Sequence, residues 1–116
     1  MGICIGLQLG IVEFARHVCG LTKATSREFS NTGEFVIDLM EDQKHIKKIG
    51  GSMRLGSYDC KLMPKSLAQK TYKKGMVRER HRHRYEVNNH YRDALSEKGM
   101  IFSGLNTELN LVEMME

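Results

Sequence analysis

The sequence predicts an α/β fold, because segments with a helical spacing of apolar residues alternate with short segments that are typical of strands. The clearest helix covers residues 5–20, where Leu7, Ile11 and Val18 recur at helical spacing and Gly20 can end the helix. No internal repeat or low-complexity stretch interrupts the pattern. The 116 residues therefore fit one ordinary domain or a part of a larger one.

The remaining elements follow in order along the chain. Residues 21–34 are polar and are expected to form a loop, and residues 41–48 a charged loop or helical turn. Two shorter helices are expected at residues 64–74, started by Pro64 and Ser66, and at residues 90–98, between Asn89 and Gly99. Strands are expected at residues 35–40, 50–56, 58–63, 76–87, 101–103 and 109–114, with the stub of another at residues 1–3.

The composition is that of a globular protein, with 41% hydrophobic and 28% charged residues. The net charge of +4 is weak evidence for an anionic partner, because much of the excess lies within residues 78–84. The three cysteines are odd in number and form no C-x-x-C pair, which argues against a disulfide framework or zinc site and favours the reducing cytoplasm. The apolar residues 1–12 lack the basic start of a signal peptide and are too short to span a membrane.

Both ends of the chain are expected to cut through the sheet of the domain. A strand before Cys4 would have only residues 1–3, and the last strand runs into Glu116. An independent domain usually begins and ends in dispensable polar residues. Strands missing at both sides would leave sheet edges and apolar faces uncovered, so the isolated chain is expected to be poorly stable or to aggregate.

Cys4 is the first candidate functional residue, in the run Gly2-Ile3-Cys4-Ile5-Gly6. A nucleophile held in a sharp turn between a strand and a helix needs small neighbours, which Gly2 and Gly6 supply. The positive end of the following helix favours a thiolate, and the N–H groups after Cys4 can bind an oxyanion. The five residues alone fit an inert, buried cysteine about equally well.

The basic run RERHRHRYEVNN (78–89) is the second candidate. Strand alternation places Arg78, Arg80, Arg82 and Arg84 on one face and His81 and His83 on the other. The run could contact phosphates or nucleic acid, supply a histidine base for Cys4, or bind a small carboxylate through one arginine. A solvated, salt-bridged edge strand is the favoured interpretation from the residues alone. The lone Glu28 in a polar loop shows no local sign of function.

Seven segments in order resemble one family: GICIGLQ, VEFAR, SREF, GGSMRLG, RERHRHRYEVNN, FSG and LVEMME. Together they are similar to the C-terminal class I glutamine amidotransferase domain of the CTP synthase family, and they extend over the whole chain. GGSMRLG and ERHRHRYEVNN are the most specific of them. The resemblance implies a Rossmann-like domain with a central mixed sheet and flanking helices, of which this chain is a part truncated at both ends.

The resemblance implies roles for individual residues. Cys4 matches the nucleophile that attacks the side-chain amide of glutamine, giving a glutamyl thioester and ammonia. Arg84 matches the residue that binds the glutamine α-carboxylate, and Glu28 the residue that contacts the amino group, which agrees with their charges. The glutamine site is also lined by the four residues after the nucleophile, which are Ile5, Gly6, Leu7 and Gln8. His81 and His83 are then structural.

The resemblance also implies parts that lie outside residues 1–116. These are a histidine base in an H-P-E segment, the glycine-rich oxyanion loop, and a synthetase domain that uses ATP and Mg²⁺ to phosphorylate UTP. The chain alone is therefore expected to show no measurable glutaminase activity. No metal or cofactor is expected within it. The implied partners are L-glutamine and the synthetase domain of the same enzyme, in a cytoplasmic homotetramer that binds neither nucleic acid nor membrane.

Two other functions stay open from the residues. The first is another class I glutamine amidotransferase that delivers ammonia to a different acceptor. The second is a non-catalytic module whose basic strand binds RNA or another polyanion.

Overall fold

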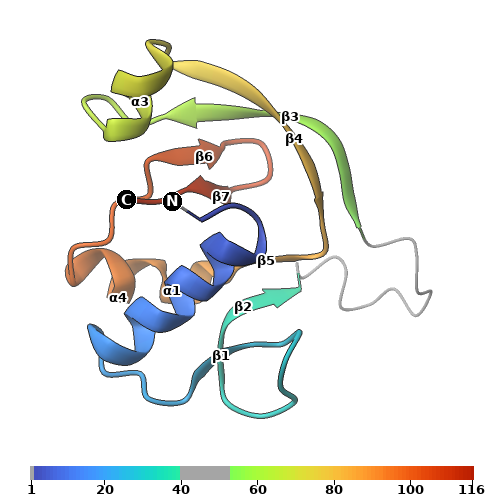
Figure 1. Cartoon of the computed structure of the whole chain (residues 1–116), viewed down its shortest axis with the longest axis vertical. Coiled ribbons are helices and arrows are strands. Elements are labelled where there is room, and N and C mark those ends of the chain that lie inside the picture. The colour runs from blue at the N-terminus through green and yellow to red at the C-terminus, as the bar shows by residue number, and fades with distance from the viewer. Residues whose placement is uncertain (1, 40–52) are drawn as a thin grey trace.

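The computed structural model describes residues 2–39 and 53–116, and their elements confirm the α/β class. The strands lie in two sheets rather than in one central sheet (Figure 1). The first sheet has the order β1 (Ala24–Ser26), β2 (Glu34–Leu39) and β5 (Tyr85–Val87). The second has the order β4 (Met76–His83), β3 (Arg54–Leu62), β6 (Gly104–Asn106) and β7 (Leu111–Met114).

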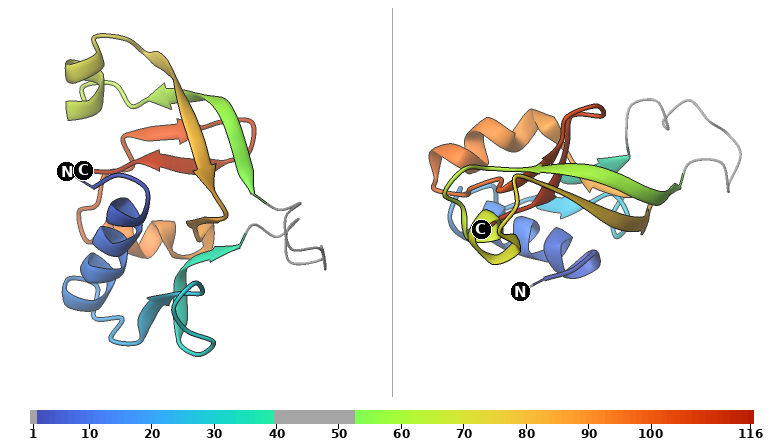
Figure 2. Two further views of the ribbon diagram at one scale, coloured as in Figure 1. Left: turned by 45° about the vertical axis from the view of Figure 1, so that its right-hand side comes forward. Right: turned by 90° about the horizontal axis from the view of Figure 1, so that it is seen from above.

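The first sheet is mixed, because β1 runs parallel to β2 while β5 is antiparallel to it. All pairings in the second sheet are antiparallel, and the β3–β4 hairpin is its longest part. Helices α1 (Ile5–His17) and α4 (Arg92–Glu97) lie on opposite sides of the layer of strands, as the right-hand view of Figure 2 shows. The short helix α3 (Leu67–Tyr72) connects β3 to β4, and the 3₁₀ turn η1 (Asn89–Tyr91) precedes α4.

The larger hydrophobic core joins α1 to the first sheet and to α4. Burial of apolar side chains here supplies the main stabilising term. The core residues are Ile11, Val12, Ala15, Ala24, Val36, Ile37, Val87, Leu95, Met100, Phe102 and Val112. A smaller cluster of Cys60, Leu62 and Val77 packs between β3 and β4. No helix among residues 2–39 and 53–116 is long and apolar enough to cross a membrane.

Several expected boundaries are wrong because pairing between strands overrides local pattern. The polar segment 21–34 contains β1, which pairs with β2 although it is only three residues long. The two strands expected on either side of Ser57 are one continuous strand, β3. The strand expected at 101–103 lies instead at Gly104–Asn106. Residues 41–48, and the parts of expected strands at residues 1, 40 and 50–52, lie outside the described residues.

The helix boundaries are shorter than expected. Helix α1 ends at His17, and Gly20 follows with φ 75° in the turn. The helix expected at 64–74 covers Leu67–Tyr72, where the Ser66 hydroxyl accepts a hydrogen bond from the Gln69 N–H. The helix expected at 90–98 is divided into η1 and α4. Gly2 and Ile3 do not form a strand.

The most consequential difference concerns the strand expected at 76–87. It breaks at Arg84 into β4 and β5, which belong to different sheets. The chain therefore leaves the second sheet and enters the first at the residue that sequence reasoning selected for carboxylate binding.

Candidate functional site

Cys4 occupies the N-cap of α1 with φ 55° and ψ −115°. Positive φ is uncommon for a residue with a side chain, costs about 1–3 kcal/mol, and is concentrated at functional sites. The thiol is free and exposed. The structure therefore places this cysteine in a strained turn at the start of a helix, as the sequence predicted.

The two glycines beside Cys4 differ in what they do. A Cβ on Gly2 would lie 2.5 Å from the carbonyl oxygen of Gly6, so the turn requires glycine there. A Cβ on Gly6 would meet nothing within 4 Å among the described residues. The expectation of crowding is right for Gly2 and wrong for Gly6. The N–H of Gly6 donates to the carbonyl of Ile3 at 2.9 Å, so it already has an acceptor within the turn.

Gln8 connects helix α1 to the break between β4 and β5. It follows Cys4 by one turn, and its backbone N–H donates to the Cys4 carbonyl at 3.2 Å. Its side chain is buried, and Nε2 donates to the Tyr85 carbonyl at 3.1 Å. The Gln8 Oε1 atom is buried and has no hydrogen-bond partner within the described part of the chain. Two other residues of this turn have different surroundings: Ile5 is exposed, whereas Leu7 packs against the main core.

Arg84 lies in the connection between β4 and β5 and is half-buried. Its Nε atom is buried without a hydrogen-bond partner among residues 2–39 and 53–116. A buried, unpaired guanidinium nitrogen is costly and is satisfied by a planar anionic acceptor. The expectation that Arg84 shares a face with Arg78, Arg80 and Arg82 is wrong, because the strand ends at His83; those three are exposed.

Glu28 lies two residues beyond the carboxyl end of β1, and its carboxylate is exposed. Its N–H donates to the Ser26 hydroxyl oxygen at 3.2 Å. The parallel strands β1 and β2 end at one edge of the first sheet, where Leu39 pairs with Tyr85 at the start of β5. Glu28 follows β1 and Arg84 precedes β5 at this edge, and Gln8, one turn after Cys4, holds the first turn of α1 to Tyr85, the residue after Arg84. Ligands of α/β sheets bind outside such strand ends.

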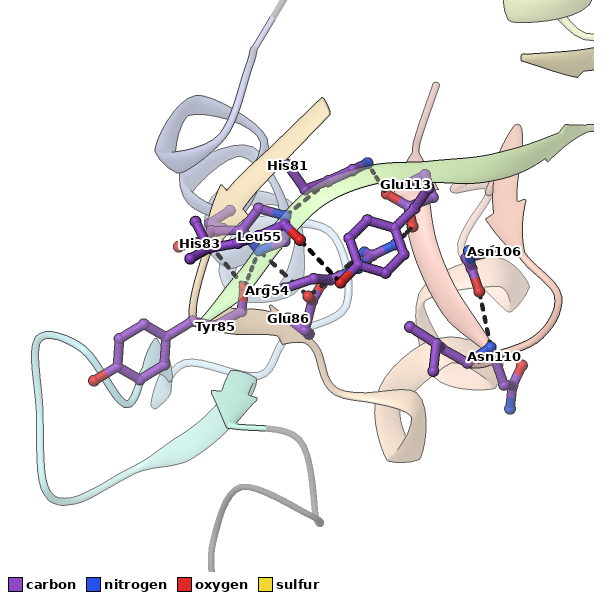
Figure 3. A network of polar contacts seen from close by, with 12 residues as sticks. Arg54, Leu55, His81, His83, Tyr85, Glu86, Asn106, Asn110 and Glu113 are labelled. Carbon is purple, nitrogen blue, oxygen red and sulfur yellow. Dashed lines mark hydrogen bonds and ion pairs between the residues drawn. The ribbon is translucent and has the colours of Figure 1, made fainter. Parts of the chain in front are cut away.

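His81 and His83 belong to a polar network (Figure 3). The Nδ1 atom of His81 lies 2.9 Å from Nε2 of His83, and Nε2 of His81 lies 3.0 Å from a carboxylate oxygen of Glu113. The Nδ1 atom of His83 faces the Tyr85 carbonyl at 3.2 Å and a Glu86 carboxylate oxygen at 3.3 Å. Because hydrogen bonds engage Nδ1 of His81 and both ring nitrogens of His83, the geometry favours a structural role over that of a base for Cys4.

Arg54, Glu86 and Glu113 complete this network, and sequence reasoning missed all three. The Arg54 guanidinium contacts Glu113, lies 3.6 Å from Glu86, and stacks 4.1 Å from the centre of the Tyr58 ring. The signal that could have found them is a carboxylate inside an apolar strand, as Glu113 is in Leu-Val-Glu-Met. A charge at such a position is tolerated only with a buried partner.

Burial shifts the proton equilibria of this network. Desolvation raises the pKa of Glu86 from 4.5 to about 7, although Arg54 opposes the shift. Desolvation also lowers the pKa of His83, assisted by His81. It lowers the pKa of His81 against the opposing charge of Glu113. In the described part of the chain, no group of three or more His, Cys, Asp or Glu side chains could hold a metal ion.

The strained cysteine elbow and the α/β architecture define a class of enzyme domain. The chain belongs to the class I glutamine amidotransferase family, whose family model matches residues 1–116. Within that family, its similarity is to CTP synthases. It is 60% identical over 116 residues to the CTP synthase of Salinibacter ruber (strain DSM 13855 / M31), covering 99% of this chain and 20% of that protein.

A second CTP synthase and a solved structure agree with this similarity. The enzyme of Chlorobium phaeobacteroides (strain BS1) is 54% identical over 117 residues, covering 100% of this chain and 21% of that protein. The glutaminase domain of Trypanosoma brucei CTPS with bound acivicin superposes with a TM-score of 0.88 at 34% identity. It covers 99% of this chain and 46% of that one. The resemblance found in the sequence is therefore confirmed, and the chain spans about a fifth of the length of the curated relatives it matches.

Proposed function

We propose that this chain carries the nucleophile and part of the glutamine site of a CTP synthase. Glutamine hydrolysis there supplies ammonia for the ATP-dependent amination of UTP to CTP. The observation that carries the proposal is the hydrogen bond from Gln8, one turn after Cys4, to the carbonyl of Tyr85, the residue after Arg84. The similarity to CTP synthases over the whole chain supports the choice of this enzyme over other members of the family.

The chemistry of the three side chains fits glutamine. The α-carboxylate binds the unpaired guanidinium of Arg84, and the α-ammonium binds the exposed carboxylate of Glu28. The Cys4 sulfur then attacks the side-chain carbonyl carbon, the C–N bond breaks, and ammonia leaves with the proton that the thiol lost. Water hydrolyses the glutamyl thioester to glutamate and restores the thiol. The residues that line the site between these groups are Ile5, Gly6, Leu7 and Gln8.

The rest of the enzyme is proposed from the same similarity. The synthetase domain would bind UTP, ATP and Mg²⁺ and receive the ammonia. The metal would act in that domain, as the similarity to CTP synthases implies. We further propose a cytoplasmic homotetramer without a nucleic-acid partner.

Protection of Cys4 from alkylation tests the proposal on the chain itself. Iodoacetamide should modify the exposed Cys4, and L-glutamine should slow that modification in a saturable way, followed by mass spectrometry of the Cys4 peptide. Cys60 serves as an internal control, because it is fully buried and burial raises its pKa to about 11.

Arg84→Met should raise the half-protecting glutamine concentration about 10- to 100-fold, because a charge-assisted hydrogen bond of ~1.5–3 kcal/mol is lost. Arg82→Met is the matched control: Arg82 is exposed and should leave protection unchanged. If L-glutamine does not protect Cys4, or if both arginine variants behave alike, the proposed site is wrong.

A further inference from the structure

One backbone carbonyl is the point at which the nucleophile helix and the buried histidines meet. The Tyr85 carbonyl accepts from Nε2 of Gln8 at 3.1 Å and lies 3.2 Å from Nδ1 of His83. The two contacts come from α1 and from the last residue of β4. Arg84 lies between His83 and Tyr85 in the chain, so it is flanked by the two residues of this contact, which Figure 3 shows.

The hydrogen-bond chain behind this carbonyl has one direction. A carbonyl oxygen can only accept, so Nδ1 of His83 carries a hydrogen. In a neutral His83, Nε2 is then an acceptor, and it receives a hydrogen bond from Nδ1 of His81 at 2.9 Å. The other ring nitrogen of His81 lies 3.0 Å from Glu113, whose carboxylate also contacts Arg54. The Tyr85 carbonyl thus fixes the tautomer of His83, and His83 fixes that of His81, whose Nε2 has no hydrogen-bond partner among the described residues.

This chain is buried enough to hold its geometry. The side chains of Glu113 and Glu86 are 3% and 6% exposed, and those of His81 and His83 are 12% and 18% exposed. Burial of this degree limits competition from water for the ring nitrogens. By contrast, the buried Nε–H of Arg84 donates no hydrogen bond to any described residue. The backbone on either side of Arg84, at His83 and Tyr85, is held by the contact between these two residues.

We propose that His83 is a positioning residue for Arg84, which rests on the proposed role of Arg84 in binding the glutamine α-carboxylate. Its Nδ1–H group fixes the Tyr85 carbonyl, and His81 orients the His83 ring. The same carbonyl receives Gln8, one turn after Cys4, so the carboxylate-binding arginine and the nucleophile share one anchor. His83 then controls how tightly glutamine binds and leaves the reactivity of the thiol unchanged.

Two amide substitutions at His83 separate positioning from simple packing. The amide nitrogen of His83→Asn can occupy the place of Nδ1 and still donate to Tyr85. The longer side chain of His83→Gln places its amide near Nε2, where it contacts His81 and not the carbonyl. The matched control is His17→Gln at an exposed histidine whose ion-pair partner is Glu13.

The readouts are the half-protecting concentration of L-glutamine and the rate of Cys4 alkylation by iodoacetamide without glutamine. His83→Gln should raise the half-protecting concentration about 10-fold, and His83→Asn should stay within about 2-fold of the unmodified chain. All variants should keep the unprotected rate. If His83→Gln does not fold, His81→Gln, which removes the Nδ1 donor to His83, should cause a rise of about 3-fold.

The outcomes are distinguishable. If Arg84→Met weakens protection but His83→Gln and His81→Gln do not, the positioning role is wrong and the glutamine site stands. If His83→Asn and His83→Gln weaken protection equally, or if the unprotected rate falls in parallel, the effect is one of packing and the inference is overturned. If L-glutamine does not protect the unmodified chain, both proposals are wrong.

Discussion

Arg54 and Glu113, which are 59 residues apart in the sequence, form an ion pair whose side chains are only 2% and 3% exposed. The pair joins the start of β3 to β7, and Glu86 of β5 lies 3.6 Å from the same guanidinium. Arg54 thereby connects the two sheets at the place where the chain passes from one to the other. Because one positive charge faces two buried carboxylates, the free energy of unfolding should depend strongly on substitutions at this junction.

Replacing Arg54 should strongly destabilise the fold. Arg54→Met leaves Glu113 and Glu86 buried without a counter-charge, and loss of one partner of a buried pair costs about 3–5 kcal/mol. The free energy of unfolding from urea denaturation measures the loss. Arg78→Met is the control, because the Arg78–Asp59 pair is 70% and 57% exposed and should change little. Equal effects of the two substitutions would contradict the importance assigned to the junction.

The two glycines of the elbow should respond in opposite ways to alanine. Gly2→Ala places a methyl group 2.5 Å from the Gly6 carbonyl oxygen, so the turn must open and the alkylation rate of Cys4 should change. Gly6→Ala meets no atom, and alanine in a helix gains up to about 1 kcal/mol over glycine. Thermal unfolding and iodoacetamide kinetics measure both effects. A Gly6→Ala chain that is less stable than the Gly2→Ala chain would contradict the described turn.

Stability should depend on pH through Glu86. Its pKa is raised to about 7 in the fold, so its contribution is fully present below pH 4.5 and is lost as the pH rises through 7. The lowered pKa values of His81 and His83 act in the opposite direction: their contribution is present above pH 6.5 and is lost as the pH falls through the folded values.

The substitution Glu86→Gln separates the effect of this carboxyl group on pH-dependent stability from that of the two histidines. Relative to the unmodified chain, the variant should gain about 3 kcal/mol of stability between pH 4.5 and 7, because each pKa unit corresponds to about 1.4 kcal/mol. Denaturation midpoints across this range measure the difference in slope. As a control, Glu108→Gln at an exposed residue should give a curve of stability against pH that is parallel to that of the unmodified chain. Parallel curves for Glu86→Gln as well would refute a protonated carboxyl at this position.

The sequence alone was sufficient to predict the features that depend on residues close together in the chain. The spacing of Leu7, Ile11 and Ala15 specifies α1, since each turn of a helix brings the next of these side chains to the same face without help from distant segments. The pattern around Cys4 specified the elbow for a similarly local reason, because the crowding at Gly2 involves atoms only four residues away. The ordered motifs were enough to indicate the family.

The tertiary structure decided what depends on residues far apart. A run of alternating charges from 78 to 87 looks like one strand, and only pairing with β3 on one side and β2 on the other breaks it at Arg84. The same break separates Arg84 from the exposed arginines, and the next residue, Tyr85, accepts a hydrogen bond from Gln8. The buried charges at 54, 86 and 113 were likewise invisible locally, because burial is set by segments from both sheets and not by sequence neighbours.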